Sequence, residues 1–177
     1  SVAAGKTIAS METHLGAAAM VRAMPNTPAM IGRGVTGAYA NAAVSEGQRD
    51  IVHRLLKVSG PVEWVDSEDA INAVTALSGS GPAYVFYLVE CMAEAGRKAG
   101  LPADLAMRLA RETVAGAGEL LHQSPDPASK LRQNVTSNRA ADSSWRDTTP
   151  AMDHIRVTAT IRNTAWVWVS RLSERNG

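Results

Sequence analysis

The pattern of the chain changes at Ser67, and this change limits the folds that are open to it. Before this point, three short runs carry strand signals, at 20–24, 34–40 and 62–66, each bounded by Gly, Pro or Asn. After it, apolar residues recur at helical spacing in several consecutive segments. The sequence therefore predicts an α+β chain, mainly α, in which a few strands precede a helical region.

A helix with clear end signals is expected between the second and third strands. Ser45 fits the N-cap, and Glu46 adds negative charge to the first turn. Gly60 and Pro61 end the segment. Its apolar stripe consists of Ile51, Val52, Leu55 and Leu56.

The helical region begins at Ser67, a capping residue followed by two acids. Residues 78–82 (SGSGP) interrupt it, and Pro82 fits the first turn of the next helix. That helix, to about residue 98, is apolar around most of its circumference, which favours burial in its domain or against another subunit. A further helix runs to about residue 122. Gly116 and Gly118 inside it suggest close approach of another helix.

Three short strands do not easily form a stable sheet, because their edges remain unpaired and their apolar faces remain in water. We therefore expect further structure, from a partner or from preceding residues, to cover or extend them.

Composition excludes several classes of protein. The chain is 45% apolar and 20% charged, with one cysteine and a net charge of +1. A lone Cys91 excludes a disulfide scaffold, and the charge balance argues against a nucleic-acid binder. No uncharged apolar run approaches the ~20 residues of a membrane span. With no visible secretory signal, a cytoplasmic location is the default expectation.

Three motif matches are weak. Residues 32–37 satisfy the letters G-x-G-x-x-G, but the expected strand follows them instead of preceding them, so we reject a dinucleotide fingerprint. The four histidines are scattered, which gives no metal site. Glycines around Ser78 and Ser80 fit an anion cradle or a packing turn equally well.

The composition changes again near residue 137. Residues 1–137 carry 12 basic and 13 acidic residues, whereas 138–177 carry six arginines, no lysine and four acids. Three of the four tryptophans lie in this tail. Two interpretations stand: a terminal β-segment, because 154–161 and 163–172 look extended, or a different reading frame or artificial junction. We favour the second.

Four motifs occur in order: MPNTPAMIGRG (24–34), INAVTALSGSGPAY (71–84), KAGLPADLAMRLA (98–110) and LRQNVTS (131–137). Together they make residues 1–137 resemble pyrroline-5-carboxylate reductase. The resemblance implies the last strands of a Rossmann-type α/β domain at 1–66 and a helical dimerisation and substrate domain at 67–137. The tail, 138–177, does not match.

The resemblance also implies a reaction. Hydride would pass from NADPH or NADH to the imine carbon of 1-pyrroline-5-carboxylate, giving L-proline, in a homodimer formed through the helices of 67–137. The glycine-rich turn that grips the pyrophosphate is expected upstream of Ser1. The choice between NADH and NADPH stays open, since the residues that discriminate them are expected there too.

Site residues follow from the resemblance, residue by residue. The cofactor-binding residues that it implies are Val2, Ala3, Ala4, Asn26 and Asn134. Residues 2–4 match a segment at the end of a strand beside the cofactor, Asn26 lies in the loop near the nicotinamide, and Asn134 matches a later cofactor contact. The substrate-binding residues that it implies are Glu68, Thr136 and Ser137. Glu68 matches an acid near the substrate, and Thr136 and Ser137 begin the loop that binds the substrate carboxylate. No catalytic residue and no metal ligand is assigned. Asn72 departs from the family's usual Asp.

The match breaks immediately after Ser137. The family continues with Pro-Gly-Gly and a threonine, whereas this chain reads NRAAD, with Asp142 directly after the position of the threonine. A carboxylate there would repel the carboxylate of the substrate. Because the change in amino-acid composition coincides with the loss of this family motif, we prefer the hypothesis of a frameshift or an artificial join.

Two functions remain in competition. The first is a fragment of a pyrroline-5-carboxylate reductase, inactive alone. The second is a non-catalytic helical module that dimerises with itself or with a full-length subunit. A fully active enzyme is poorly supported, because both the phosphate grip and the carboxylate loop are missing.

Overall fold

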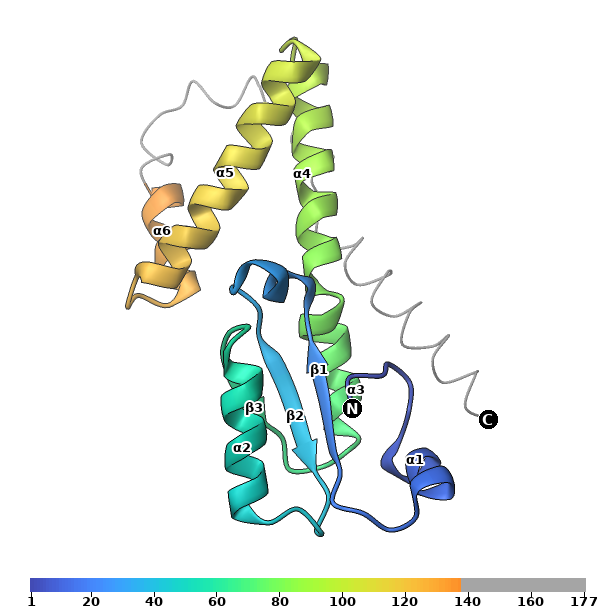
Figure 1. Ribbon diagram of the computed structural model, residues 1–177. Helices are drawn as coiled ribbons and strands as arrows, with labels where there is room; N and C mark the ends of the chain where they lie inside the picture. The colour runs from blue at the N-terminus through green and yellow to red at the C-terminus, as the bar shows by residue number, and fades with distance from the viewer. Residues whose placement is uncertain (138–177) are drawn as a thin grey trace. The chain divides into compact units, whose positions relative to one another are not determined.

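The computed structural model describes residues 1–137 of the 177-residue chain, so every prediction about the tail 138–177 lies outside the described residues. Contacts divide the described part into two compact units, Ser1–Tyr84 and 85–137. Figure 1 shows the elements of both. Each unit is described by itself.

A three-stranded sheet forms the centre of the first unit (Figure 1). Its order is β1 (Val21–Pro25), β2 (Thr36–Ala40) and β3 (Val62–Trp64). β1 pairs with β2 antiparallel, and β2 pairs with β3 parallel. All three predicted strands are confirmed, with ends shifted by at most two residues.

Alternation along β1 gives the sheet two different faces. Val21 and Ala23 border a hollow that α2 (Glu46–Lys57) also lines. Arg22 and Met24 point the other way, towards the segment containing α3 (Ala70–Val74): Arg22 contacts Glu68, and Met24 lies against Gly79. Side chains of β1 therefore pack on both faces of the sheet.

The ends of α2 confirm the sequence signals. The Ser45 hydroxyl accepts a hydrogen bond from the Gln48 amide, and the Gln48 side chain accepts one from the Ser45 amide, a reciprocal capping box. Gly60 follows the helix with φ of +136°, a conformation that side chains disfavour. Ser45 was predicted as the N-cap, whereas its partner Gln48 was not.

Two short helices were not predicted. α1 (Ile8–Leu15) carries only one buried residue, Ile8, although Ile8, Met11 and Leu15 have the i, i+3, i+7 spacing of a helix, a signal that could have indicated it. A 3-10 helix at Thr27–Ile31 precedes Gly32, and β2 follows it. This order confirms the rejection of a dinucleotide fingerprint at 32–37.

The expected interruption between two helices takes the form of a π-helical segment, Thr75–Gly79. α4 (Gly81–Lys98) starts directly after it, with Pro82 in the first turn as predicted. Gly100 ends this part of the chain with φ of +98°. α5 (Ala103–Gln123) and α6 (Ala128–Ser137) follow.

Small residues allow α4 and α5 to approach each other in the second unit. Ala93, Ala106 and Ala110 are buried, and a Cβ on Gly96 would lie 3.2 Å from the Ala106 side chain. The same test finds nothing within 4 Å at Gly116 and Gly118. The predicted close approach at those two glycines is therefore absent within the described residues, and Gly96 has that role instead.

Much of the apolar surface of α4 is exposed in this structure. Val85 is 45% exposed, Phe86 60% and Tyr87 54%. The sequence predicted that α4 is buried either in its own domain or against another subunit. For these three residues, burial in its own domain is not observed. None of the described helices is both long and apolar enough to cross a membrane.

Gly37 is a test of the close packing between β2 and α3. A Cβ there would lie 2.5 Å from Cγ1 and 2.9 Å from Cγ2 of Val74. We expect Gly37→Ala to lower the free energy of unfolding by about 1–3 kcal/mol through this overpacking. Urea unfolding measures it.

Gly47→Ala is the matched control, because a Cβ at Gly47 meets nothing within 4 Å and lies in α2. We expect it to raise stability by up to ~1 kcal/mol through helix propensity. Adding Val74→Ala should restore part of the loss in Gly37→Ala. Equal stability of the two alanine variants would contradict the packing.

Candidate functional site

Asn26 fixes the loop that follows β1. Its Oδ1 accepts a hydrogen bond from the Val35 amide at 3.0 Å, and its carbonyl accepts one from the Ala29 amide at 3.1 Å. Its Nδ2 lies 3.5 Å from the Ser78 hydroxyl, a long contact to the π-helical segment. The side chain is half-buried. Asn26 therefore joins both ends of the loop and touches the segment after α3.

The first residues of the chain lie along the free edge of β1. The Ser1 ammonium group donates to the Val21 carbonyl at 2.6 Å, and the Ala23 amide donates to the Ser1 carbonyl at 2.8 Å. This pair of bonds is the pattern of parallel strands. Val2, Ala3 and Ala4 follow and are exposed. Two of the predicted cofactor segments, 2–4 and Asn26, thus both border β1.

Glu68 accepts two hydrogen bonds at one oxygen. Arg22 Nη1 and the Ile8 backbone amide each lie 2.7 Å from its Oε1. The Arg22 side chain is 6% exposed and the Glu68 side chain 27%. The predicted substrate-binding acid is therefore the centre of a mostly buried ion pair that joins β1 to the start of α1.

Asn134, Thr136 and Ser137 lie in the last turns of α6, in the second unit. The Thr136 hydroxyl donates within the helix, to the carbonyls of Arg132 and Gln133. The structure thus gathers Val2, Asn26 and Glu68 in one unit and these three residues in the other. The predicted carboxylate loop after Ser137 lies outside the described residues.

The glycine-rich turn at 78–82 packs against the sheet. Gly79 would place a Cβ 3.6 Å from the Met24 side chain, and the Ser80 amide donates to the Thr75 carbonyl at 2.8 Å. These contacts favour the packing turn over the anion cradle, because the Ser80 amide is already used within the helix.

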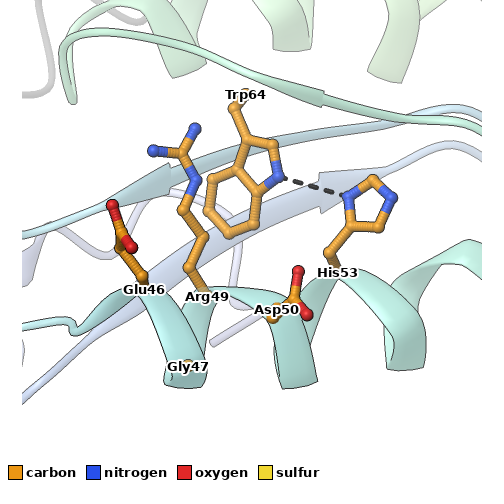
Figure 2. Close-up of a pocket in the computed structure, with 6 residues that line it drawn as sticks. All are labelled: Glu46, Gly47, Arg49, Asp50, His53 and Trp64. Carbon is orange, nitrogen blue, oxygen red and sulfur yellow. Dashed lines mark hydrogen bonds between the residues drawn. The ribbon is translucent and has the colours of Figure 1, made fainter.

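A surface hollow of about 580 Å³ lies between the first half of α2 and the end of β3 (Figure 2). The Trp64 indole N–H donates to His53 Nδ1 at 3.3 Å. The Arg49 guanidinium lies 4.4 Å from the centre of the Trp64 ring, a cation–π contact. Glu46, Gly47 and Asp50 complete the lining. Sequence reasoning missed this group, since its members have no motif spacing.

A second hollow, of about 350 Å³, lies between β1 and α2. Most of its lining is apolar and comes from three parts of the first unit: Val2, Val21, Ala23, Val44, Ile51, Val52 and Leu56. The predicted stripe of α2 thus faces the sheet, but Ile51 remains 52% exposed and Leu55 69%. This side of the sheet is incompletely covered within residues 1–137.

The described residues contain no group of three or more His, Cys, Asp or Glu side chains that could hold a metal ion. Clear pKa shifts lie on the exposed surface of α4. A hydrogen bond from Arg97 lowers the pKa of Glu94, and a hydrogen bond with Cys91 raises the pKa of Tyr87. Both residues belong to α4, which contains none of the predicted site residues.

Comparison with known proteins gives a consistent result. Residues 68–142 match the family model for pyrroline-5-carboxylate reductase dimerisation. The matched range therefore extends past Ser137, to residue 142. The pyrroline-5-carboxylate reductase of Pseudomonas aeruginosa is 46% identical over 138 residues, which make up 77% of this chain and 50% of that protein. The chain therefore spans half the length of this relative.

Solved structures show the same likeness. A pyrroline-5-carboxylate reductase from Coxiella burnetii matches with a TM-score of 0.80 at 34% identity, covering 95% of this chain and 62% of that chain. The Plasmodium falciparum pyrroline carboxylate reductase, solved with NADP bound, matches with a TM-score of 0.77 over 99% of this chain and 70% of that one. Its 24% identity supports the fold alone. The predicted resemblance and the mainly helical fold with a small sheet are confirmed.

Asn26 offers a test of the loop at the end of β1. We expect Asn26→Ala to cost about 1–2 kcal/mol of unfolding free energy, because the Val35 amide loses its acceptor. Asn26→Asp keeps this acceptor and removes only the weak donor to Ser78, so it should cost less. Urea unfolding of both variants checks the order, and an alanine variant as stable as the aspartate variant would contradict it.

Proposed function

Because residues 68–142 match the model for pyrroline-5-carboxylate reductase dimerisation, we propose that this chain is the C-terminal part of a reductase of 1-pyrroline-5-carboxylate. The single observation that carries the proposal is 46% identity to such an enzyme over 138 residues. The whole protein would reduce the imine to L-proline in proline biosynthesis. We keep a cytoplasmic location as an expectation.

The proposed cofactor is NADPH or NADH, which when bound supplies a hydride to the imine carbon while the ring nitrogen gains a proton. Residues 2–4 and Asn26 fit its nicotinamide end, because both border β1 where the strand ends and the loop is held in place. Ligands of open α/β sheets bind at such strand ends. The described residues include no glycine-rich turn that leads from a strand into a helix, which is what a pyrophosphate needs.

The proposed division places the nucleotide-binding remnant at 1–66 and the dimerisation and substrate domain at 67–137. The parallel hydrogen bonds of Ser1 along β1 and the partly open apolar hollow under α2 support a sheet with further strands. Glu68 is the proposed substrate acid, Asn134 a cofactor contact, and Thr136 and Ser137 the start of the carboxylate loop. The tail, 138–177, stays outside this division.

We also keep the second candidate, a dimerisation module without catalysis of its own. It is favoured by the exposed apolar residues of α4 and α5, which include Phe86, Leu109, Leu120 and Leu121. Such residues are typical of surfaces that a partner subunit covers. The two candidates agree on assembly and differ in turnover.

The activity test uses the purified chain with 1-pyrroline-5-carboxylate and NADPH, then NADH. We expect no oxidation of the cofactor above background. Two fusions then locate the missing parts. One joins the preceding half of the Pseudomonas aeruginosa relative to Ser1, and the other also replaces 138–177 by the sequence of that relative.

Turnover by the second fusion supports the reductase proposal. Comparison with the first fusion shows how much activity is lost when residues 138–177 of this chain are present. Turnover by the chain alone would contradict the proposal that it is inactive alone. A folded second fusion without any turnover would contradict the reductase function of residues 1–137 and leave the dimerisation module.

Assembly is tested at Val85. We expect the chain to be a dimer by light scattering and Val85→Asp to be a monomer, because the substitution buries an unpaired charge at the interface. Lys98→Glu also adds negative charge to α4, at an exposed charged position, and should leave the dimer intact. Circular dichroism checks that helicity is retained. A monomeric wild-type chain would contradict the proposed assembly.

A further inference from the structure

Arg22 is one of two buried polar or charged residues of the described chain, the other being Thr36. It is the second residue of β1, on the face directed towards α3. A guanidinium cannot lose its charge at ordinary pH, so its burial is unfavourable unless a partner compensates it. Glu68 is that partner, at 2.7 Å.

The Glu68 carboxylate is itself held from several sides. Its Oε1 receives the Arg22 guanidinium and the Ile8 amide, both at 2.7 Å, which is the short range of charge-assisted hydrogen bonds. Its backbone carbonyl accepts the Ile71 amide at 3.0 Å, and the Ile71 side chain is only 1% exposed. The position of this oxygen is therefore set by β1, by α1 and by the buried start of α3.

α1 depends on this carboxylate. Ile8 is the first residue of the helix and the only buried one. A negative charge at a helix N-terminus is favourable, because the free amides there carry partial positive charge. Thr7 satisfies the Ser10 amide, and Glu68 satisfies the Ile8 amide. The Ile8 side chain and the Glu68 oxygen are thus the anchors of a helix that begins four residues after the segment 2–4.

We propose that Arg22 is a positioning residue, which holds Glu68 so that one carboxylate oxygen bridges β1 and the N-terminus of α1. With Arg22 in place, Oε1 is used by two protein donors. The Glu68 side chain keeps 27% of its surface exposed. The last step rests on the proposed function: the second carboxylate oxygen of Glu68, Oε2, is left for the ring nitrogen of a cyclic imino acid.

The test follows amide hydrogen exchange of the full chain by NMR in Arg22→Met, which removes the charge with little change of length. We expect exchange at Ile8 to become about tenfold faster than in wild type, the loss expected for a charge-assisted hydrogen bond whose acceptor is no longer held. The Val65 amide, bonded to Ala38 in the same unit, is the internal reference. A general loss of stability accelerates both amides, whereas lost positioning accelerates Ile8 alone.

Two further variants complete the design. Arg22→Lys keeps the charge and should restore part of the protection at Ile8, and it replaces the methionine variant if that one does not fold. Arg97→Met removes an exposed pair of the same 2.7 Å length, between Arg97 and Glu94, and should leave Ile8 unchanged. L-proline, added as a probe to the second fusion, in which the relative's sequence replaces 138–177, should bind more weakly when that fusion carries Arg22→Met.

The outcomes separate the positioning role from the proposed function. Faster exchange at Ile8 relative to Val65, with partial rescue by lysine, supports the role of Arg22. Unchanged or parallel exchange at the two amides in a folded variant overturns it. If the second fusion, which carries the relative's carboxylate loop, does not bind L-proline, the substrate role of Glu68 fails, while the exchange ratio still decides the role of Arg22.

Discussion

The first unit depends on the alternation of side chains along the five residues of β1. Val21 and Ala23 face an apolar hollow, and Arg22 and Met24 face the segment around α3. A shift by one residue would place the Arg22 guanidinium in the apolar hollow, where no described carboxylate lies, and would leave Glu68 without its cation. The buried ion pair thus specifies the register of β1 more strongly than its few apolar residues could.

Most of the element pattern could be predicted from the sequence, because its signals are local. Ser45, Pro82 and Gly100 act within one turn of their own positions, and each marks a helix end in the structure. α1 was not predicted, although Ile8, Met11 and Leu15 have helical spacing. Its anchor is Glu68, 60 residues away along the chain, and no periodicity within α1 indicates such a contact.

The site was predictable only as a set of positions carried over from a resemblance. The resemblance identifies Asn26 and Glu68, but their contacts arise from the fold: Asn26 bonds to Val35, and Glu68 bonds to Arg22 and Ile8. Arg22 was not singled out, because a lone arginine in a short strand has the pattern of an ordinary surface residue. The group around Trp64 was missed for the same reason, since β3 and α2 bring its members together only in three dimensions.

Trp64 is the only tryptophan in residues 1–137. Its indole bonds to His53 on one side and stacks with Arg49, so both the hydrogen bond and the ring contact come from α2. A protein ending at Ser137 would therefore contain a single tryptophan, which can be excited apart from the tyrosines and lies where the last strand meets the helix beside it. Its emission would report the docking of that helix without any added label.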